Sequence, residues 1–193
     1  MDTRKKQLTV EDYAAFHQRL VKAVEEEIAE EGSTKLGLIF SGQGPAGVIQ
    51  LRALLREKVN LPSVVICTNE RLLRRQVAFT RPENCKETFR DTVPLEPADK
   101  VLLLTDAAAS GVSICKAALI VRKFGARCNA AFALFDRQQG ATEKLALDGI
   151  RLTSFFNRDF LLREGPDGLQ PTDFECFPQL SLDEFASTTA TVA

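Results

Sequence analysis

A single carboxylate stands at the end of an apolar run and is followed by small residues. The run is Val101–Thr105, the carboxylate is Asp106, and Ala, Ser and Gly dominate the next residues. Such a turn lets the backbone approach a ligand closely, and its N–H groups can converge on an anion. A helix that begins here would add the positive end of its dipole. The predicted phosphate-binding residues are Ala109, Ser110, Gly111, Val112 and Ser113.

Asp106 itself cannot serve the phosphate group, because both are negatively charged. A carboxylate suits hydroxyl groups, or a cation that is carried with the phosphate. A sugar phosphate meets both demands, since its hydroxyl groups lie close to its anionic end. In the alternative interpretation, Asp106 only caps a helix after a tight turn. The spacing alone does not distinguish the two.

A second glycine-rich turn, GQGPAG, occupies Gly42–Gly47. It follows a strand-like run and precedes a helical segment, which is the context of a dinucleotide-binding Gly-x-Gly-x-x-Gly turn. Glu70 follows the next strand-like run, at the place where a dinucleotide-binding fold has an acid that binds the ribose. The turn therefore raises the hypothesis of a dinucleotide-binding oxidoreductase. That hypothesis leaves Asp106 and the pair Asp136-Arg137 unexplained.

These residues are expected to be positioned by an α/β fold. Continuous apolar runs alternate with helical segments along the chain, and such runs are typical of strands covered on both faces. The alternation predicts a single-domain fold with a mainly parallel central sheet flanked by helices. Ligands bind beyond the carboxyl ends of such strands, where Asp106 would stand. The expected strands are Leu36–Phe40, Ser63–Cys67, Val101–Thr105, Asn129–Phe135 and one from Ile150; the expected helices are Val48–Lys58, Ile114–Phe124 and Thr142–Leu147.

A first helix is expected before these strands. Apolar residues recur at spacings of three and four from Tyr13 to Ile28, and Gly32 would end the helix. The glutamates from Glu25 to Glu31 are interpreted as its solvated end, and His17, the only histidine, as non-catalytic. The predicted organisation is an N-terminal helical segment (1–34), a core (35–165) and a C-terminal extension with a disordered tail (166–193).

Composition narrows the classes of function. A net charge of −1 and a pI near 6.0 argue against nucleic acid as a partner, so any phosphate recognition must be local. No apolar run has the length of about 20 residues that spans a bilayer, and the N-terminal residues lack an apolar signal core. The five cysteines contain no Cys-x-x-Cys pair. We therefore expect a cytoplasmic protein without a membrane segment or a protein-held metal.

The Asp106 stretch resembles the phosphoribosyl-diphosphate motif of the type I phosphoribosyltransferases. That motif has an apolar strand, two acids, two apolar residues and a Thr/Ser/Gly-rich phosphate loop. A second stretch, Phe132–Phe156, resembles the matching region of orotate phosphoribosyltransferases, in which a strand ends in Asp-Arg before a glycine turn and a helix. The resemblance covers Val101–Leu162, and the strand order extends it back to Leu36.

The resemblance implies transfer of ribose 5-phosphate from phosphoribosyl diphosphate to a nucleobase, most simply orotate, with release of pyrophosphate. It implies that Asp106 binds the ribose hydroxyls and that Arg137 faces the base. Mg²⁺ would be carried with phosphoribosyl diphosphate, and the protein would be a homodimer. The glycine turn would hold pyrophosphate through Gly42, Gln43 and Gly44, and the basic segment Asn69–Pro97 would supply Arg71, Arg74 and Arg75.

Three departures from the family pattern keep a second alternative open. Thr105 stands where the family has the first of its two acids, and Ala109 and Val112 stand at positions that usually carry a hydroxyl and a second glycine. The segment Asn69–Pro97 lacks the family's Lys-rich pattern and its closing His-Gly. These departures allow a relative that binds the sugar phosphate with little or no turnover.

Overall fold

The structure is a computed structural model of the 193-residue chain. It describes residues 10–40, 46–68, 93–158, 162–165 and 168–171. The chain divides into two compact units, His17–Arg158 and a second one formed by residues 1–16 and 159–193. The described strands of the second unit, β6 (Leu162–Gly165) and β7 (Gly168–Pro171), form an antiparallel pair that the sequence did not predict. The predicted boundaries at residues 34 and 165 remain predictions.

One five-stranded sheet forms the centre of the unit His17–Arg158. Its order is β2-β1-β3-β4-β5, and each neighbouring pair is parallel. The predicted mainly parallel sheet is confirmed. Its strands are β1 (Lys35–Phe40), β2 (Ser63–Cys67), β3 (Lys100–Ala108), β4 (Arg127–Asp136) and β5 (Arg151–Asn157).

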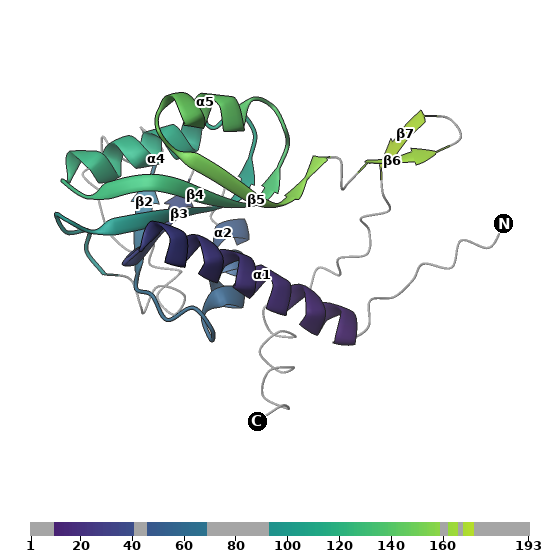
Figure 1. Ribbon diagram of the computed structural model, residues 1–193, viewed down its shortest axis with the longest axis horizontal. Coiled ribbons are helices and arrows are strands. Elements are labelled where there is room, and N and C mark those ends of the chain that lie inside the picture. Colours follow the sequence, from purple (N-terminus) through teal and green to yellow (C-terminus); the bar gives the residue numbers. More distant parts are fainter. Residues whose placement is uncertain (1–9, 41–45, 69–92, 159–161, 166–167, 172–193) are drawn as a thin grey trace. The chain divides into compact units, whose positions relative to one another are not determined.

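Helices cover both faces of this sheet (Figure 1), as continuous apolar strands require. Helix α4 packs against β1 to β4, and α5 packs against β5 on the same face. Helix α2 packs against β1 and β3 on the opposite face, which it shares with α1. The helices are α1 (Val10–Glu31), α2 (Ala46–Leu55), α4 (Val112–Lys123) and α5 (Ala141–Leu147).

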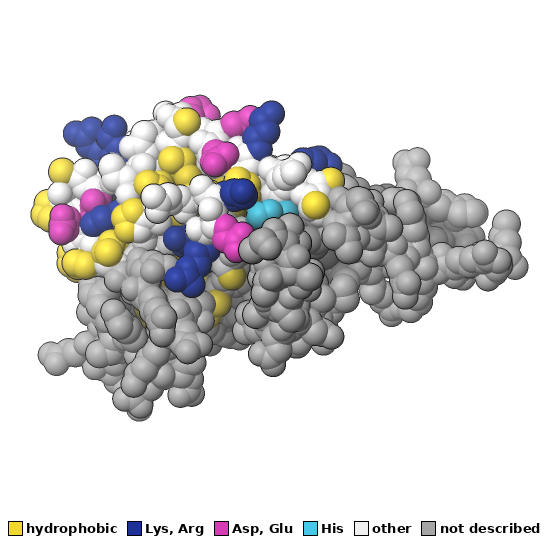
Figure 2. Space-filling view, turned by 90° about the horizontal axis from the view of Figure 1, so that it is seen from below, with side chains coloured by type: hydrophobic (Ala, Val, Ile, Leu, Met, Phe, Trp, Pro, Cys, Tyr) yellow, Lys and Arg dark blue, Asp and Glu magenta, His cyan; other side chains and the backbone are white. Residues whose placement is uncertain are grey.

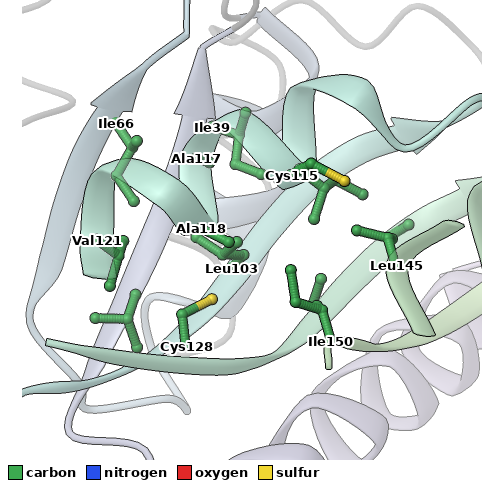
Figure 3. Close-up of a cluster of buried hydrophobic side chains, with 14 of the residues drawn as sticks. Ile39, Ile66, Leu103, Cys115, Ala117, Ala118, Val121, Cys128, Leu145 and Ile150 are labelled. Carbon is green, nitrogen blue, oxygen red and sulfur yellow. The ribbon is translucent and has the colours of Figure 1, made fainter. Parts of the chain in front are cut away.

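A hydrophobic core lies between α4 and the sheet (Figure 3). Ala117 and Ala118 are almost completely buried, so small side chains let the helix approach the strands closely. Leu103 from β3 and Val121 from α4 are 0% exposed. Burying a side chain of this size contributes about 1.5–3 kcal/mol to the stability of the fold. Packing of the apolar face of α4 on the apolar strands therefore fixes the position of the sheet edge.

The strand order reverses between β1 and β3. From β1 the chain crosses to β2 on one side, whereas β3 pairs with the other side of β1 and leads to β4 and β5. The connections after β1 and β3 therefore lead to opposite faces, through α2 and α4. A parallel sheet opens a ligand-binding crevice at such a point, at the carboxyl ends of the two strands. This order differs from the 3-2-1-4-5-6 order of a dinucleotide-binding domain.

The glutamate-rich end of α1 differs from the prediction. Glu27 is only 6% exposed, and its Oε1 accepts hydrogen bonds from Arg151 Nη1 (2.9 Å) and Thr153 Oγ1 (2.7 Å) on β5. Arg151 Nη2 donates to Glu31 Oε1 at 3.1 Å. The interpretation of this cluster as a solvated end was therefore wrong for Glu27. A buried carboxylate is tolerated here because a cation and a hydroxyl compensate it.

Candidate functional site

Asp106 lies inside β3, two residues before its end, because this strand continues to Ala108 instead of ending at Thr105 as predicted. Its side chain is exposed, after a buried run from Val101 to Thr105. The backbone N–H of Ala107 donates to Asp106 Oδ1 at 2.8 Å, and Thr105 Oγ1 reaches the same oxygen at 3.4 Å. Among the described residues, no donor reaches Oδ2. Hydrogen bonds thus hold Oδ1, whereas Oδ2 accepts none from the described residues.

The N-terminal turn of α2 meets Asp106. A Cβ atom built on Gly47 would overlap Asp106 Oδ2, and would lie 2.6 Å from Asp106 Cβ and 2.7 Å from Cγ. Gly47, the last glycine of the Gly42–Gly47 turn, therefore lies against Asp106, although the two residues are far apart in sequence. Sequence reasoning assigned Gly47 only to a turn spacing and missed this contact. Gly42, Gln43 and Gly44 lie outside the described residues.

The predicted phosphate cradle is the amino end of α4. Gly111 is the N-cap with φ 73°, and Cys115 N donates to Gly111 O at 2.9 Å, so the helix starts directly after this glycine. No side chain caps this end. The first N–H groups of a helix have no intrahelical acceptor, so those of Val112 and Ser113 are available to an anion. Ser110 beside them is exposed.

Gly111 also leaves little room for a side chain. A Cβ there would lie 3.3 Å from the Cα and the carbonyl oxygen of Ala141, and 3.3 Å from Leu145 Cγ. The amino ends of α4 and α5 therefore pack directly against each other. The left-handed φ favours glycine at this position, and the close neighbours disfavour any side chain there.

Arg137 lies at the same edge of the sheet, directly after β4. Ala108 of β3 pairs with Asp136 of β4, and Arg137 N donates to Ala108 O at 2.8 Å. Asp136 is 7% exposed, and its Oδ1 accepts from Gln138 N at 2.8 Å, which fixes the turn that presents Arg137. The Arg137 side chain itself is exposed. The structure thus confirms that Asp106 and Asp136 share one edge.

Thr105 does not present its hydroxyl to this edge. It is 6% exposed, and Thr105 Oγ1 donates to Ala107 O at 3.1 Å. Thr105 Oγ1 also lies 3.4 Å from Asp106 Oδ1, so the hydroxyl is engaged with the end of its own strand. A second acid at position 105 would therefore have to be accommodated in a buried, hydrogen-bonded place.

The remaining sequence predictions have varied outcomes. Arg71, Arg74 and Arg75 lie outside the described residues. His17 Nε2 lies 2.6 Å from Leu54 O, which fits a structural role in joining α1 to α2. Within the described residues, no group of three His, Cys, Asp or Glu could hold a metal ion. No helix in the same part of the chain is long and apolar enough to cross a membrane.

Charge on the described surface is mixed. On the face shown in Figure 2, lysine and arginine side chains are interspersed with aspartate and glutamate side chains. Neither sign forms a continuous field there, in agreement with a net charge of −1. An anion would accordingly be held by local groups such as the end of α4 rather than by the whole surface.

Sequence comparison relates the chain to orotate phosphoribosyltransferases. The enzyme of Saccharolobus solfataricus is 33% identical over 107 residues, which are 55% of this chain and 53% of that protein. The chain thus spans about half the length of this curated relative. No family model matches the sequence.

Solved structures agree over a larger share of the chain. The orotate phosphoribosyltransferase of Mycobacterium tuberculosis in complex with 5-phospho-α-D-ribosyl 1-diphosphate superposes with a TM-score of 0.53 and 16% identity, covering 75% of each chain. The chain has the type I phosphoribosyltransferase fold. The resemblance read from the Asp106 and Asp136-Arg137 stretches is confirmed.

The phosphoribosyltransferase fold does not by itself select a base. The APRTase of Giardia lamblia in complex with 9-deazaadenine superposes equally well, with a TM-score of 0.53, 17% identity and 74% of this chain covered. It covers 79% of that chain. The fold therefore does not distinguish this chain's orotate-enzyme neighbours from its APRTase neighbours.

Proposed function

We propose that the protein transfers ribose 5-phosphate from phosphoribosyl diphosphate to a nucleobase, most simply orotate, and releases pyrophosphate. One observation carries the proposal. The exposed carboxylate of Asp106 lies near the end of β3, and the uncapped amino end of α4 follows this strand, so both lie at the edge where the strand order reverses. A sugar phosphate needs an acceptor for its hydroxyls and a donor set for its phosphate, and this edge offers both.

The chemistry requires charge placement rather than a nucleophilic side chain. A bond from ribose C1 to a base nitrogen forms as the bond from C1 to the pyrophosphate oxygen breaks, and positive charge develops on the ribose. Asp106 would stabilise the ribose through its hydroxyls while α4 holds the 5-phosphate. Gly42, Gln43 and Gly44 with Arg71, Arg74 and Arg75 are proposed for the departing pyrophosphate.

The residues fit a magnesium ion that arrives with the substrate. Mg²⁺ is commonly bound through one or two carboxylates plus substrate phosphates, and Asp106 offers one carboxylate oxygen without a described donor. The described residues contain no cluster that would hold the ion alone. When bound, the ion would offset the negative charge of pyrophosphate.

Orotate is favoured by Arg137. A guanidinium can grip a carboxylate and a neighbouring carbonyl with paired hydrogen bonds, and orotate carries both groups. The exposed Arg137 side chain starts from the turn that is bonded to the end of β3. The orotate enzymes among the sequence relatives support the same choice.

Pyrophosphate release with Mg²⁺ and a panel of orotate, uracil, adenine and hypoxanthine tests the proposal. We expect release with orotate, and a loss of about 100-fold or more in kcat/KM for Asp106→Asn, because a neutral amide cannot stabilise the developing charge. Glu57→Gln is the control, since Glu57 is also an exposed carboxylate but lies beyond the carboxyl end of α2. Activity with adenine or hypoxanthine alone would move the protein to a purine branch.

A binding protein without turnover is the second candidate. It is favoured by Thr105, whose buried hydroxyl donates to Ala107 O and offers no second carboxylate to the ribose. Calorimetry with phosphoribosyl diphosphate and Mg²⁺ separates the two candidates. Binding of phosphoribosyl diphosphate without release of its pyrophosphate in the presence of any of the four bases would select the second. Protection against heat by NAD or FAD alone would instead support the dinucleotide hypothesis.

The proposal includes a homodimer, as the resemblance implies. Light scattering on the full chain measures the mass directly. A mass of one chain at working concentration would remove this part of the proposal and leave the reaction untouched. A cytoplasmic location also remains part of the proposal.

A further inference from the structure

We propose that Gly47 is a positioning residue for Asp106, and that the missing side chain at the start of α2 sets the direction of the ribose-binding carboxylate. The inference rests on the proposed function. It adds to that function a residue from a different element, which does not itself contact the substrate. It also explains why α2 begins with a glycine inside its first turn.

Backbone conformation does not account for this glycine. The described glycines with positive φ are Gly32, Gly111, Gly125, Gly140 and Gly149, and Gly47 is not among them. Any L-residue could adopt its backbone angles, and alanine would favour the helix more than glycine does. The reason for glycine must therefore lie in its surroundings rather than in its own φ.

Those surroundings are the Asp106 side chain. All three of the nearest atoms to a Cβ built on Gly47 belong to Asp106: Oδ2, Cβ and Cγ. The Cβ and Cγ distances, 2.6 and 2.7 Å, are shorter than real side chains tolerate. Asp106 Cβ is anchored to the β3 backbone and cannot move without the strand. A methyl group at position 47 must therefore turn the carboxylate or shift α2.

The carboxylate has little freedom to turn. Asp106 Oδ1 accepts the Ala107 N–H at 2.8 Å, and Thr105 Oγ1 approaches the same oxygen. With Oδ1 held on the β3 side, Oδ2 lies over Gly47 at the positive end of the α2 dipole. Rotation away from Gly47 would break the Ala107 hydrogen bond and swing both oxygens from their present positions. A ribose diol that is bound by these oxygens would lose its partner.

A double-mutant cycle on the full chain tests this coupling. The variants are Gly47→Ala, Asp106→Gly and their combination; glycine is chosen at 106 because it removes all three atoms that alanine at 47 would meet. Affinity for phosphoribosyl diphosphate with Mg²⁺ is measured by calorimetry, and the melting temperature is measured without ligand. Val48→Ala is the control, because it weakens the same turn of α2 by removing a buried side chain and adds nothing near Asp106.

We expect Gly47→Ala to weaken binding about tenfold or more in the wild type and not at all in Asp106→Gly, as loss of a charge-assisted hydrogen bond predicts. Gly47→Ala should lower the melting temperature of the wild type and raise that of Asp106→Gly, where only helix propensity remains. Val48→Ala should lower the melting temperature and leave affinity unchanged.

Three outcomes overturn the inference. Equal weakening in both backgrounds would mean that Gly47 does not act through Asp106, and unchanged affinity of Gly47→Ala in the wild type would mean that it positions nothing. In both cases the wild type still binds, so the proposed function stands. A wild type that does not bind phosphoribosyl diphosphate overturns the proposed function and the positioning role with it, whatever the melting temperatures show.

Discussion

At the scale of single residues, Arg137 is the residue that we propose to face the base. Arg137→Lys keeps the charge and removes the paired hydrogen bonds, so we expect the KM for orotate to rise about tenfold or more. The KM for phosphoribosyl diphosphate should change little. Steady-state kinetics with each substrate varied in turn measures both.

A matched control for Arg137 lies at the other end of the same strand. Arg127 is exposed and begins β4, so Arg127→Lys makes the same chemical change away from the site. Its kinetic constants should stay at the wild-type values. A rise of both KM values in Arg137→Lys would instead assign Arg137 a structural role.

The residues that were predictable from sequence are those whose role is local. The sequence predicts the places of Asp106 and Gly111 in the fold because an apolar strand, a turn and a helix follow one another without interruption. Gly47 and Glu27 were misjudged, because each depends on a partner that sequence cannot place. The partner of Gly47 is known only once β3 is beside β1, and that of Glu27 only once β5 reaches α1.

At the scale of elements, the contact between the amino ends of α4 and α5 depends on Gly111. Gly111→Ala should destabilise the fold by about 1–2 kcal/mol for the left-handed backbone, with a further cost for contact with Ala141. It should also weaken phosphate binding, because the helix end would shift. Chemical denaturation and calorimetry with phosphoribosyl diphosphate measure the two effects.

Gly149 separates backbone strain from packing. It has a similar positive φ of 67°, but a Cβ there meets nothing within 4 Å. Gly149→Ala should therefore carry the strain alone, destabilise less than Gly111→Ala and leave ligand affinity unchanged. Equal losses of stability for the two variants would contradict the importance of the contact between α4 and α5.

The ends of helices and strands were predicted well where a glycine or another turn-forming residue marks them. Gly32, Gly125 and Gly149 follow the ends of helices, and β2 has the predicted bounds. The sequence predicts that β3 ends at Thr105, before the aspartate, whereas the strand extends to Ala108. The strand continues since Ala107 and Ala108 pair with Phe135 and Asp136 of β4, and such pairing overrides the local propensity of a single aspartate.

At the scale of the whole molecule, two buried thiols tie stability to pH. Burial, with a hydrogen bond to Asp148, raises the pKa of Cys115 from 9.0 to about 11, and burial raises that of Cys128 from 9.0 to about 12. The folded state therefore keeps these protons when the unfolded chain has released them. Their stabilisation is complete below pH 9 and is lost as the pH rises towards 11 to 12.

We expect the free energy of unfolding to fall steadily between these pH values, as measured by urea denaturation at a series of alkaline pH values. Cys128→Ala should show a shallower fall, and alkylation by iodoacetamide at pH 8 should spare both thiols in the folded protein. Rapid alkylation of Cys128 without unfolding would contradict its burial. A fall of the same slope in Cys128→Ala would assign the pH dependence to other groups.

The hydrogen bond between Glu27 of α1 and Arg151 of β5 has a consequence for how the chain is made. Glu27 and Arg151 are separated by 124 positions, and the helix that carries Glu27 is synthesised long before the strand that carries Arg151. A carboxylate without its cation costs several kcal/mol to bury, so Glu27 must stay hydrated on the growing chain. Helix α1 is therefore made before β5, and its glutamate-bearing face is buried only when Arg151 and Thr153 are in place.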